Sequence, residues 1–151
     1  MAAGLLFECD DQVAAWTFEK FYLPPMKYDR AVGIVENKAI IGAILFQSWN
    51  GHNVELSYYS VKPTLSVGIT RCLARYILFT FNVSRITVST RRRNRNLMRS
   101  LQRMGFRLEG AQHRFYGHRD CNRNTAIRFV MFRERIEHYA KLPAEKEKQS
   151  C

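Results

Sequence analysis

The sequence predicts a single mixed α+β domain with a mostly antiparallel central sheet and flanking helices. The chain has 151 residues, the size of one ordinary domain, and 46% of them are hydrophobic, which is enough for a packed core. Short segments with a two-residue alternation are interspersed with longer segments of helical periodicity. One strand–helix–strand crossing between residues 60 and 86 implies a parallel pair inside an otherwise antiparallel sheet.

The first part of the chain is predicted as a strand, a helix and a three-stranded meander. Asp10 and Asp11 favour a helix start, apolar residues recur at helical spacing over 12–21, and Pro24-Pro25 ends that helix. The predicted strands are rich in β-branched and aromatic residues and are separated by polar turns. They cover residues 5–7, 31–35, 39–47 and 54–61.

The second part is predicted as two helices and three strands. Residues 67–81 are apolar almost throughout, and that length favours a helix buried against the sheet. Residues 91–104 carry apolar side chains on one helical face, and Gly105 is a natural helix end. The predicted strands cover residues 85–90, 106–110 and 127–132. The order is β-α-β-β-β-α-β-α-β-β, in one domain of residues 1–140 followed by a polar tail over 141–151.

Positive charge is concentrated in the second part of the chain. The formal net charge is +11, yet residues 1–62 carry 5 Lys+Arg and 7 Asp+Glu, and residues 63–151 carry 19 and 6. Arginines stand at 91, 92, 93, 95, 99, 103 and 107, and no carboxylate occurs between Glu55 and Glu109. Because Arg forms bidentate pairs with phosphate, this pattern predicts an anionic partner. A phosphorylated cofactor, a nucleic acid or both would fit.

The sequence shows neither a recognisable targeting signal nor a metal-binding motif. The N-terminus does not resemble a signal peptide, and no apolar run approaches the ~18 residues of a membrane span. We therefore predict a cytoplasmic protein whose four cysteines are reduced. His113, His118 and Cys121 lie close together but lack the paired spacing of a structural zinc site, so no metal is predicted.

The segment from Asn94 to Gly110, NRNLMRSLQRMGFRLEG, resembles the fourth conserved motif of the GCN5-related N-acetyltransferases. In that motif an Asn stands eleven residues before a Gly-Phe pair, here Gly105-Phe106, often followed by Glu-Gly. The sequence GHRD at 117–120 is similar to the branch of ribosomal-protein N-terminal acetyltransferases. The family's element order matches the predicted one over residues 5–137. The resemblance implies the acyl-CoA N-acyltransferase fold, with acetyl-CoA as co-substrate.

The resemblance also implies where acetyl-CoA binds. The sheet is expected to open between the strands at 54–61 and 85–90, and Asn94 would border the cofactor. Helix N-termini favour phosphate, so the helix after the first of these strands would hold the pyrophosphate. The family signature Arg/Gln-x-x-Gly-x-Gly/Ala is represented by LSVGIT at 65–70, which retains the first Gly, and the family's frequent Tyr is Leu101 here. The implied cofactor-binding residues are Tyr59, Ser60, Val61, Val67, Gly68, Ile69, Thr70, Arg71 and Asn94.

Acetyl transfer to an amine requires a group that accepts the proton of the amine. Glu55 is the best candidate, because it lies on the strand that would line the cleft; the alternative places it on the outer sheet face beside solvent. Tyr116 is the candidate acid for the departing thiolate. Tyr58, Tyr59 and Ser100 are further options, and any of the tyrosines can instead be a packed aromatic. A thiolate can also leave without a dedicated acid.

Two functions from different classes follow. The first is an N-acetyltransferase that moves acetyl from acetyl-CoA directly to an amine of a protein, a peptide or another molecule. The alternative is a catalytically degenerate module that binds a nucleic acid, a ribosome or tRNA surface, or a partner protein through its arginine-rich face. Aromatic residues are not interleaved with the arginines, which disfavours the alternative. The acceptor and the oligomeric state stay open.

Overall fold

The computed structural model describes residues 3–141 and shows a seven-stranded mixed sheet with four α-helices. The strand order across the sheet is β1-β2-β3-β4-β5-β7-β6, and β4 and β5 are its parallel pair. The elements are β1 (Gly4–Leu6), α1 (Asp10–Lys20), β2 (Arg30–Glu36), β3 (Ala39–Gln47), β4 (Asn53–Ser60), α2 (Val67–Thr80), β5 (Arg85–Arg91), α3 (Arg95–Met104), β6 (Arg107–Gln112), a 3₁₀ turn (Asn122–Asn124), β7 (Ala126–Phe132) and α4 (Arg133–Ala140). The predicted α+β class and element order are confirmed.

The arginine-rich segment differs from its prediction as one continuous helix over 91–104. Arg91 is the last residue of β5 and pairs with Ala126 of β7. Asn94 then caps α3, because its side-chain oxygen accepts a hydrogen bond from the Leu97 N–H at 3.3 Å. The helix therefore begins at Arg95, and only the arginines at 95, 99 and 103 follow one another along it.

Helix α4 is absent from the prediction. Its Ile136 is buried, and the hydroxyl of Tyr139 donates to the Met104 carbonyl at 2.6 Å, which ties α4 to the end of α3. The Arg75 Nε of α2 donates to the Ala140 carbonyl at 2.9 Å. The predicted tail, apart from Lys141, lies outside the described residues.

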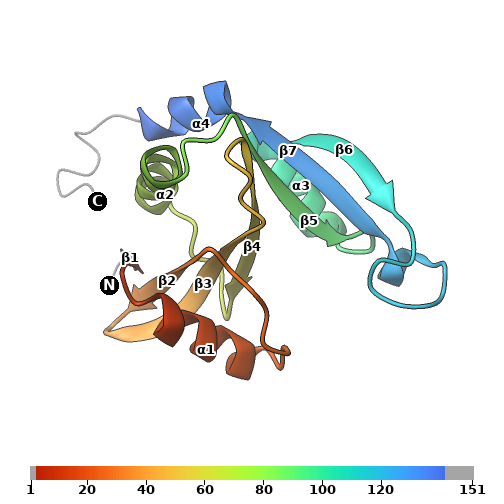
Figure 1. The fold of residues 1–151 in the computed structure, drawn as a ribbon, viewed down its shortest axis with the longest axis horizontal. Helices are drawn as coiled ribbons and strands as arrows, with labels where there is room; N and C mark the ends of the chain where they lie inside the picture. The colour runs from red at the N-terminus through yellow and green to blue at the C-terminus, as the bar shows by residue number, and fades with distance from the viewer. Residues whose placement is uncertain (1–2, 142–151) are drawn as a thin grey trace.

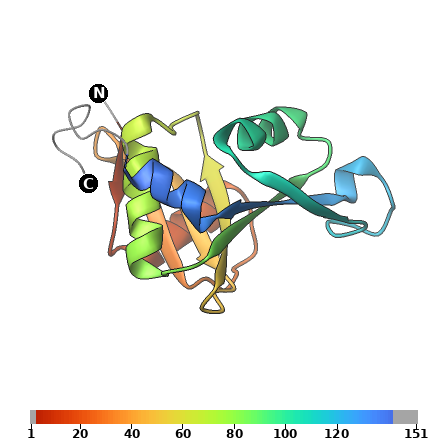
Figure 2. The same ribbon diagram turned by 90° about the horizontal axis from the view of Figure 1, so that it is seen from above.

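The helices cover the two faces of the sheet unequally (Figure 1). On one face α1 packs its Val13 and Ala14 against Ala43 and Leu45 of the sheet. On the other face α2, α3 and α4 share the larger core, in which Ile77, Leu101 and Ile136 are buried with strand residues. The α1 face of β5, β7 and β6 carries no helix (Figure 2).

The strands β5, β7 and β6 form an arm that extends away from the body built on β1–β4 (Figure 1). The arm carries α3 on one side and ends in the loop between β6 and β7. All six residues of the edge strand β6 are exposed. The body and the arm meet along the short parallel pairing of β4 with β5.

Two details of α2 and the cysteines depart from expectation. The Arg71 side chain is fully buried, whereas Phe79 is 92% exposed, because the helix turns Phe79 away from the buried stripe that contains Ile77.

Cys9 and Cys121 are free thiols, but Cys72 is disulfide-bonded, so the prediction of a fully reduced set is wrong at Cys72. Within residues 3–141, no helix has the length and apolar character needed to cross a membrane.

Candidate functional site

The sheet opens into a wedge between β4 and β5. The two strands pair over four residue pairs, from Asn53 with Arg85 to Leu56 with Val88. Beyond this point β4 continues along β3 to Ser60, and β5 continues along β7 to Arg91. Backbone groups on the facing edges of residues 57–60 and 89–91 are therefore left without a sheet partner. Tyr59 and Ser60 lie in this part of β4, and the Val61 that follows donates its N–H to the Ile41 carbonyl at 3.0 Å.

Helix α2 begins close to the open end of β4. Ser66 is its N-cap, since its hydroxyl accepts from the Ile69 N–H at 3.2 Å and its carbonyl accepts from the Thr70 N–H at 2.9 Å. The N–H groups of Val67 and Gly68 in the first turn have no partner within a helix and remain to bind an anion. Ile69 and Arg71 have buried side chains, so their side chains face the core.

The Asn94…Gly105-Phe106 motif has structural roles in α3. Asn94 caps its start, and Gly105 ends it in the left-handed conformation with φ of 105°. A Cβ atom at Gly105 would lie 2.5 Å from Arg135 Nε, which donates to the Met104 carbonyl at 3.1 Å. Phe106 is buried in the main core. These contacts explain the spacing of the motif, and they leave Asn94 at the arm side of the wedge.

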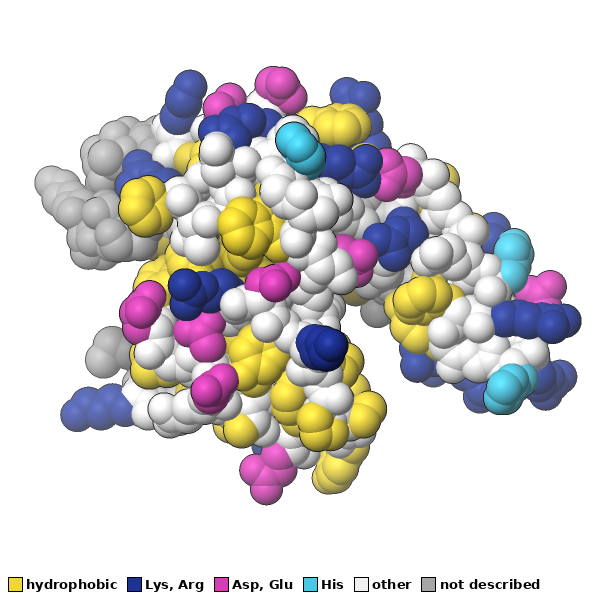
Figure 3. Space-filling view, viewed as in Figure 1, with side chains coloured by type: hydrophobic (Ala, Val, Ile, Leu, Met, Phe, Trp, Pro, Cys, Tyr) yellow, Lys and Arg dark blue, Asp and Glu magenta, His cyan; other side chains and the backbone are white. Residues whose placement is uncertain are grey.

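Glu55 lies on β4 at the foot of the wedge, on the sheet face that carries α1. Alternation along the strand puts its side chain on the same face as Tyr59, which packs against the core cluster that contains Val13 of α1. Glu55 Oε2 accepts from Arg128 Nη2 of β7 at 3.1 Å, and the glutamate side chain is 38% exposed. Arg128 also donates to Ser89 Oγ at 3.1 Å. The ion pair therefore crosses β5 and links the body to the arm (Figure 3 shows the hollow between them).

Tyr116 comes to the same region from the β6–β7 loop. Its ring lies under the Arg91 guanidinium, whose central carbon is 4.4 Å from the ring centroid, and its N–H donates to the Asn124 carbonyl at 3.1 Å. Burial raises the pKa of Tyr116; the nearby Arg91 opposes that shift, and Tyr59 adds to it. The pKa of Tyr59 is also raised by burial. Both phenols thus stay protonated at neutral pH and can act as hydrogen-bond donors.

The other predicted candidates lie elsewhere. Tyr58 points to the opposite face from Glu55 and shares a 3.0 Å hydrogen bond with Thr64 Oγ1. Ser100 lies in the middle of α3. His113 contacts Asp120 at 3.1 Å, and within residues 3–141 there is no cluster of three or more His, Cys, Asp or Glu side chains placed to hold a metal ion.

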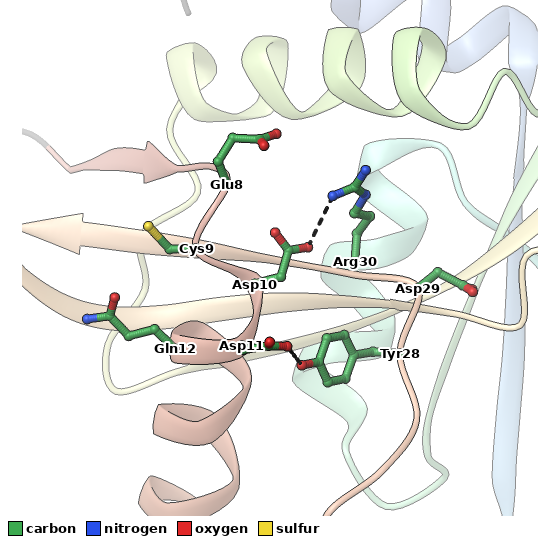
Figure 4. A pocket seen from close by; sticks show the side chains of 8 residues that line it. All are labelled: Glu8, Cys9, Asp10, Asp11, Gln12, Tyr28, Asp29 and Arg30. Carbon is green, nitrogen blue, oxygen red and sulfur yellow. Dashed lines mark hydrogen bonds and ion pairs between the residues drawn. The ribbon is translucent and has the colours of Figure 1, made fainter.

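An acidic pocket of about 460 Å³ lies at the start of α1, and Figure 4 shows that two of its carboxylates, Asp10 and Asp11, are already engaged. Asp10 accepts from the Ala31 N–H at 2.9 Å and pairs with Arg30 at 3.8 Å. Asp11 accepts from the hydroxyl of Tyr28, which raises the pKa of Tyr28 to about 12. These contacts fasten α1 to β2, and β3 separates the pocket from the wedge strand β4.

Three residues of the wedge were not predicted. They are Arg128, which binds Glu55; Arg91, which stacks on Tyr116; and Phe21, whose ring centroid is 5.4 Å from that of Tyr59. Arg128 did give a signal in the sequence, because it is the one charge in the otherwise apolar segment AIRFVMF. A charge in a strand core usually has a partner.

Comparison with known proteins shows the same fold. No family model and no curated protein sequence matches the chain. Among solved structures, variant forms of the spermidine/spermine N-acetyltransferase of Vibrio cholerae superpose with a TM-score of 0.61 at 15% identity, covering 87% of this chain and 81% of theirs. The complex of spermidine N-acetyltransferase from the same organism with CoA and spermine gives 0.56 at 16% identity, covering 72% and 68%.

A GNAT-family acetyltransferase of Bacillus anthracis gives a TM-score of 0.52 at 15% identity, covering 69% of this chain and 66% of that one. The chain therefore has the fold of the GCN5-related N-acetyltransferases, as its motif implied. At 15–16% sequence identity, the similarity to these proteins shows a common fold and nothing further.

Proposed function

We propose that this protein is an N-acetyltransferase that moves acetyl from acetyl-CoA directly to an amine. The observation that carries the proposal is the wedge: two strands part beside a helix N-terminus, and a carboxylate lies at the foot of the opening. The unpaired strand edge suits an extended amide-containing chain such as pantetheine. The first turn of α2 suits a pyrophosphate. The structural neighbour with bound CoA has the same fold.

The chemistry assigns distinct roles to the residues of the wedge. The amine nitrogen attacks the thioester carbonyl, a C–N bond forms, and the C–S bond breaks. Glu55 accepts the proton that the amine loses, and Arg128 holds the carboxylate in place through their 3.1 Å contact. The departing thiolate takes a proton from Tyr116 or from water. The raised pKa of Tyr116 makes it a weak acid, so its main contribution is a hydrogen bond.

The charges beside Glu55 indicate the class of acceptor. On the α1 face of the arm, Arg85, Arg91 and Arg128 outnumber the carboxylates Glu55 and Glu109. Like charges brought together weaken binding, so this face disfavours a polyamine such as the spermine bound by the structural neighbour. We therefore assign a protein or peptide amine with acidic or neutral neighbours as the acceptor.

The test is release of the CoA thiol from acetyl-CoA in the presence of amines. Two probes are compared: spermidine, and a short peptide with a free N-terminal amine and acidic side chains. We expect amine-dependent thiol release, faster with the peptide. Thiol release no faster than without amine for both probes would refute the transferase; a preference for spermidine would refute the acceptor assignment alone.

A further inference from the structure

The arm carries a second basic surface that the wedge does not use. Residues 85–128 contain twelve Arg, no Lys, and two carboxylates, Glu109 and Asp120. Glu109 pairs with Arg85 and Asp120 contacts His113, so both are already engaged. Arg128 pairs with Glu55, and Arg91 stacks on Tyr116. These contacts account for the arginines around the wedge.

The remaining arginines of the arm have no ion-pair partner among residues 3–141. Three of them, Arg95, Arg99 and Arg103, are exposed along α3. Arg92 and Arg93 lie in the turn before this helix, and others lie in the β6–β7 loop. Like charges at four-residue spacing on a helix repel one another, so the surface is destabilising unless a polyanion covers it. The expected partner is therefore polyanionic.

The second basic surface also contains a pocket. It measures about 290 Å³ and lies between α3 and the strands β6 and β7. Its polar lining residues are Arg92, Arg95, Arg99 and Gln102, and the rest of its lining, which we call its floor, is apolar. The floor consists of Met98, Leu108, Ile127 and Phe129, and Leu108 is 62% exposed. Its strand residues belong to β6 and β7, which lie on the far side of β5 from the wedge.

The fold also places aromatic rings among the arginines. In the sequence, the aromatic residues are separate from the arginine run. In the structure, Phe115 is 53% exposed and packs edge-on against Tyr116, with ring centroids 5.0 Å apart, and Arg91 stacks on the latter. The β6–β7 loop thus combines a solvent-facing ring with guanidinium groups. Tyr116 and Arg91 belong to the wedge, so the exposed ring of Phe115 is the one that this loop offers to an unpaired base.

We infer that the outer face of α3, with the pocket beside β6, binds single-stranded RNA. Phosphates contact the exposed arginines of α3, and an unpaired base lies on the apolar floor between guanidinium groups. A duplex keeps its bases stacked and cannot fill the pocket. An acidic peptide supplies negative charge but no planar ring for the floor. This site is separate from the proposed acetyl-CoA site, because it lies against β6 and β7 rather than between β4 and β5.

The test measures fluorescence anisotropy of a labelled single-stranded RNA of ~16 nucleotides, within the range of known site sizes. The charge variant combines Arg95→Gln, Arg99→Gln and Arg103→Gln, and its matched control combines Lys20→Gln, Lys27→Gln and Lys38→Gln in the body. All six residues are exposed. We expect the arginine variant to bind about tenfold more weakly or worse, with a log–log salt slope shallower by about 2. The lysine control should bind like the wild type.

A second variant, Leu108→Ser, tests the pocket floor without changing charge. Its affinity should fall while the salt slope stays the same, because no phosphate contact is lost. Equal weakening by the lysine control would overturn the inference, as would duplex RNA or polyglutamate binding as tightly as the single strand. Thermal stabilisation by acetyl-CoA should survive in the arginine variant, so the outcome is independent of the transferase proposal.

Discussion

At the residue scale, the proposed role of Glu55 as proton acceptor follows from its position in the fold. It stands at the last stretch of β4 that still pairs with β5, so its carboxylate lies where the wedge begins. Arg128 reaches it from the arm, and this contact orients the carboxylate without fully burying it. The face that carries Glu55 also carries Tyr59, and the glutamate side chain is 38% exposed, so its role as proton acceptor stays a prediction.

Replacement of Glu55 tests its role as proton acceptor. Glu55→Gln keeps an oxygen that can accept from Arg128, and a partly exposed ion pair is worth only about 0–1 kcal/mol, so the fold should be retained. We expect kcat with the peptide amine to fall about 100-fold. The matched control is Glu109→Gln, which removes the other Arg-paired carboxylate of this face. An unchanged rate for Glu55→Gln across the pH range would remove the assignment.

The Arg85–Glu109 pair predicts a pH dependence of stability. The hydrogen bond from Arg85 holds the pKa of Glu109 below its usual 4.5. A carboxyl group whose pKa is lowered by folding stabilises the protein above its unfolded pKa, and this contribution is lost as pH falls through the folded pKa. In urea unfolding, the difference between wild type and Glu109→Gln should be constant above about pH 5 and shrink below pH 4.5. A difference that grows at acid pH would contradict this explanation.

At the scale of secondary-structure elements, the length of α3 explains the spacing between Asn94 and Gly105 in the motif. The helix starts where Asn94 caps it and stops where Gly105 adopts a positive φ, so the interval between the two equals the helix length. The cap and the stop are both readable from sequence. The prediction started this helix too early because β5 pairing with β7 runs on to Arg91, and strand pairing between distant segments leaves no local signal.

Substitution of Gly105 tests the helix end. Gly105→Ala places a Cβ in a left-handed conformation and against Arg135, so we expect the free energy of unfolding to fall by about 1–2 kcal/mol. Gly110→Ala is the matched control, because a Cβ there meets no atom within 4 Å and should change stability by no more than about 0.5 kcal/mol. Equal denaturation midpoints for the two variants would show that the Gly is not required.

At the scale of the whole molecule, a body and an arm share one sheet and diverge at the wedge (Figure 1). The sequence predicted the α+β class and the order of elements along the chain, and its resemblance to the GCN5-related N-acetyltransferases implied the position of the opening. It did not predict α4, whose burial depends on docking against α2 and α3, or the Glu55–Arg128 pair, which joins residues 73 positions apart. Such contacts depend on tertiary packing, whereas caps, turns and periodicity are local.

The charge pattern also becomes clear only in the folded molecule. The excess positive charge in the second part of the chain comes from two groups of arginines. One group faces the wedge, and the other lies on the outer side of α3. The first group surrounds the proposed acceptor site. The second group is the surface that we assign to RNA. Counting charges along the sequence cannot separate the two groups of arginines, because Arg91 and Arg95 are close in the chain but belong to different groups.

The most direct test of the account is thermal unfolding with and without acetyl-CoA. At about 100 times Kd the ligand should stabilise the protein by about 2.7 kcal/mol, which raises Tm by about 5 °C or more. Gly68→Asp is the matched variant: a carboxylate in the first turn of α2 favours the helix but repels a pyrophosphate there. It should unfold at the wild-type temperature or above and show no rise with acetyl-CoA. A wild-type protein whose Tm does not move with acetyl-CoA, or a Gly68→Asp variant that shifts equally, would contradict acetyl-CoA binding in the wedge.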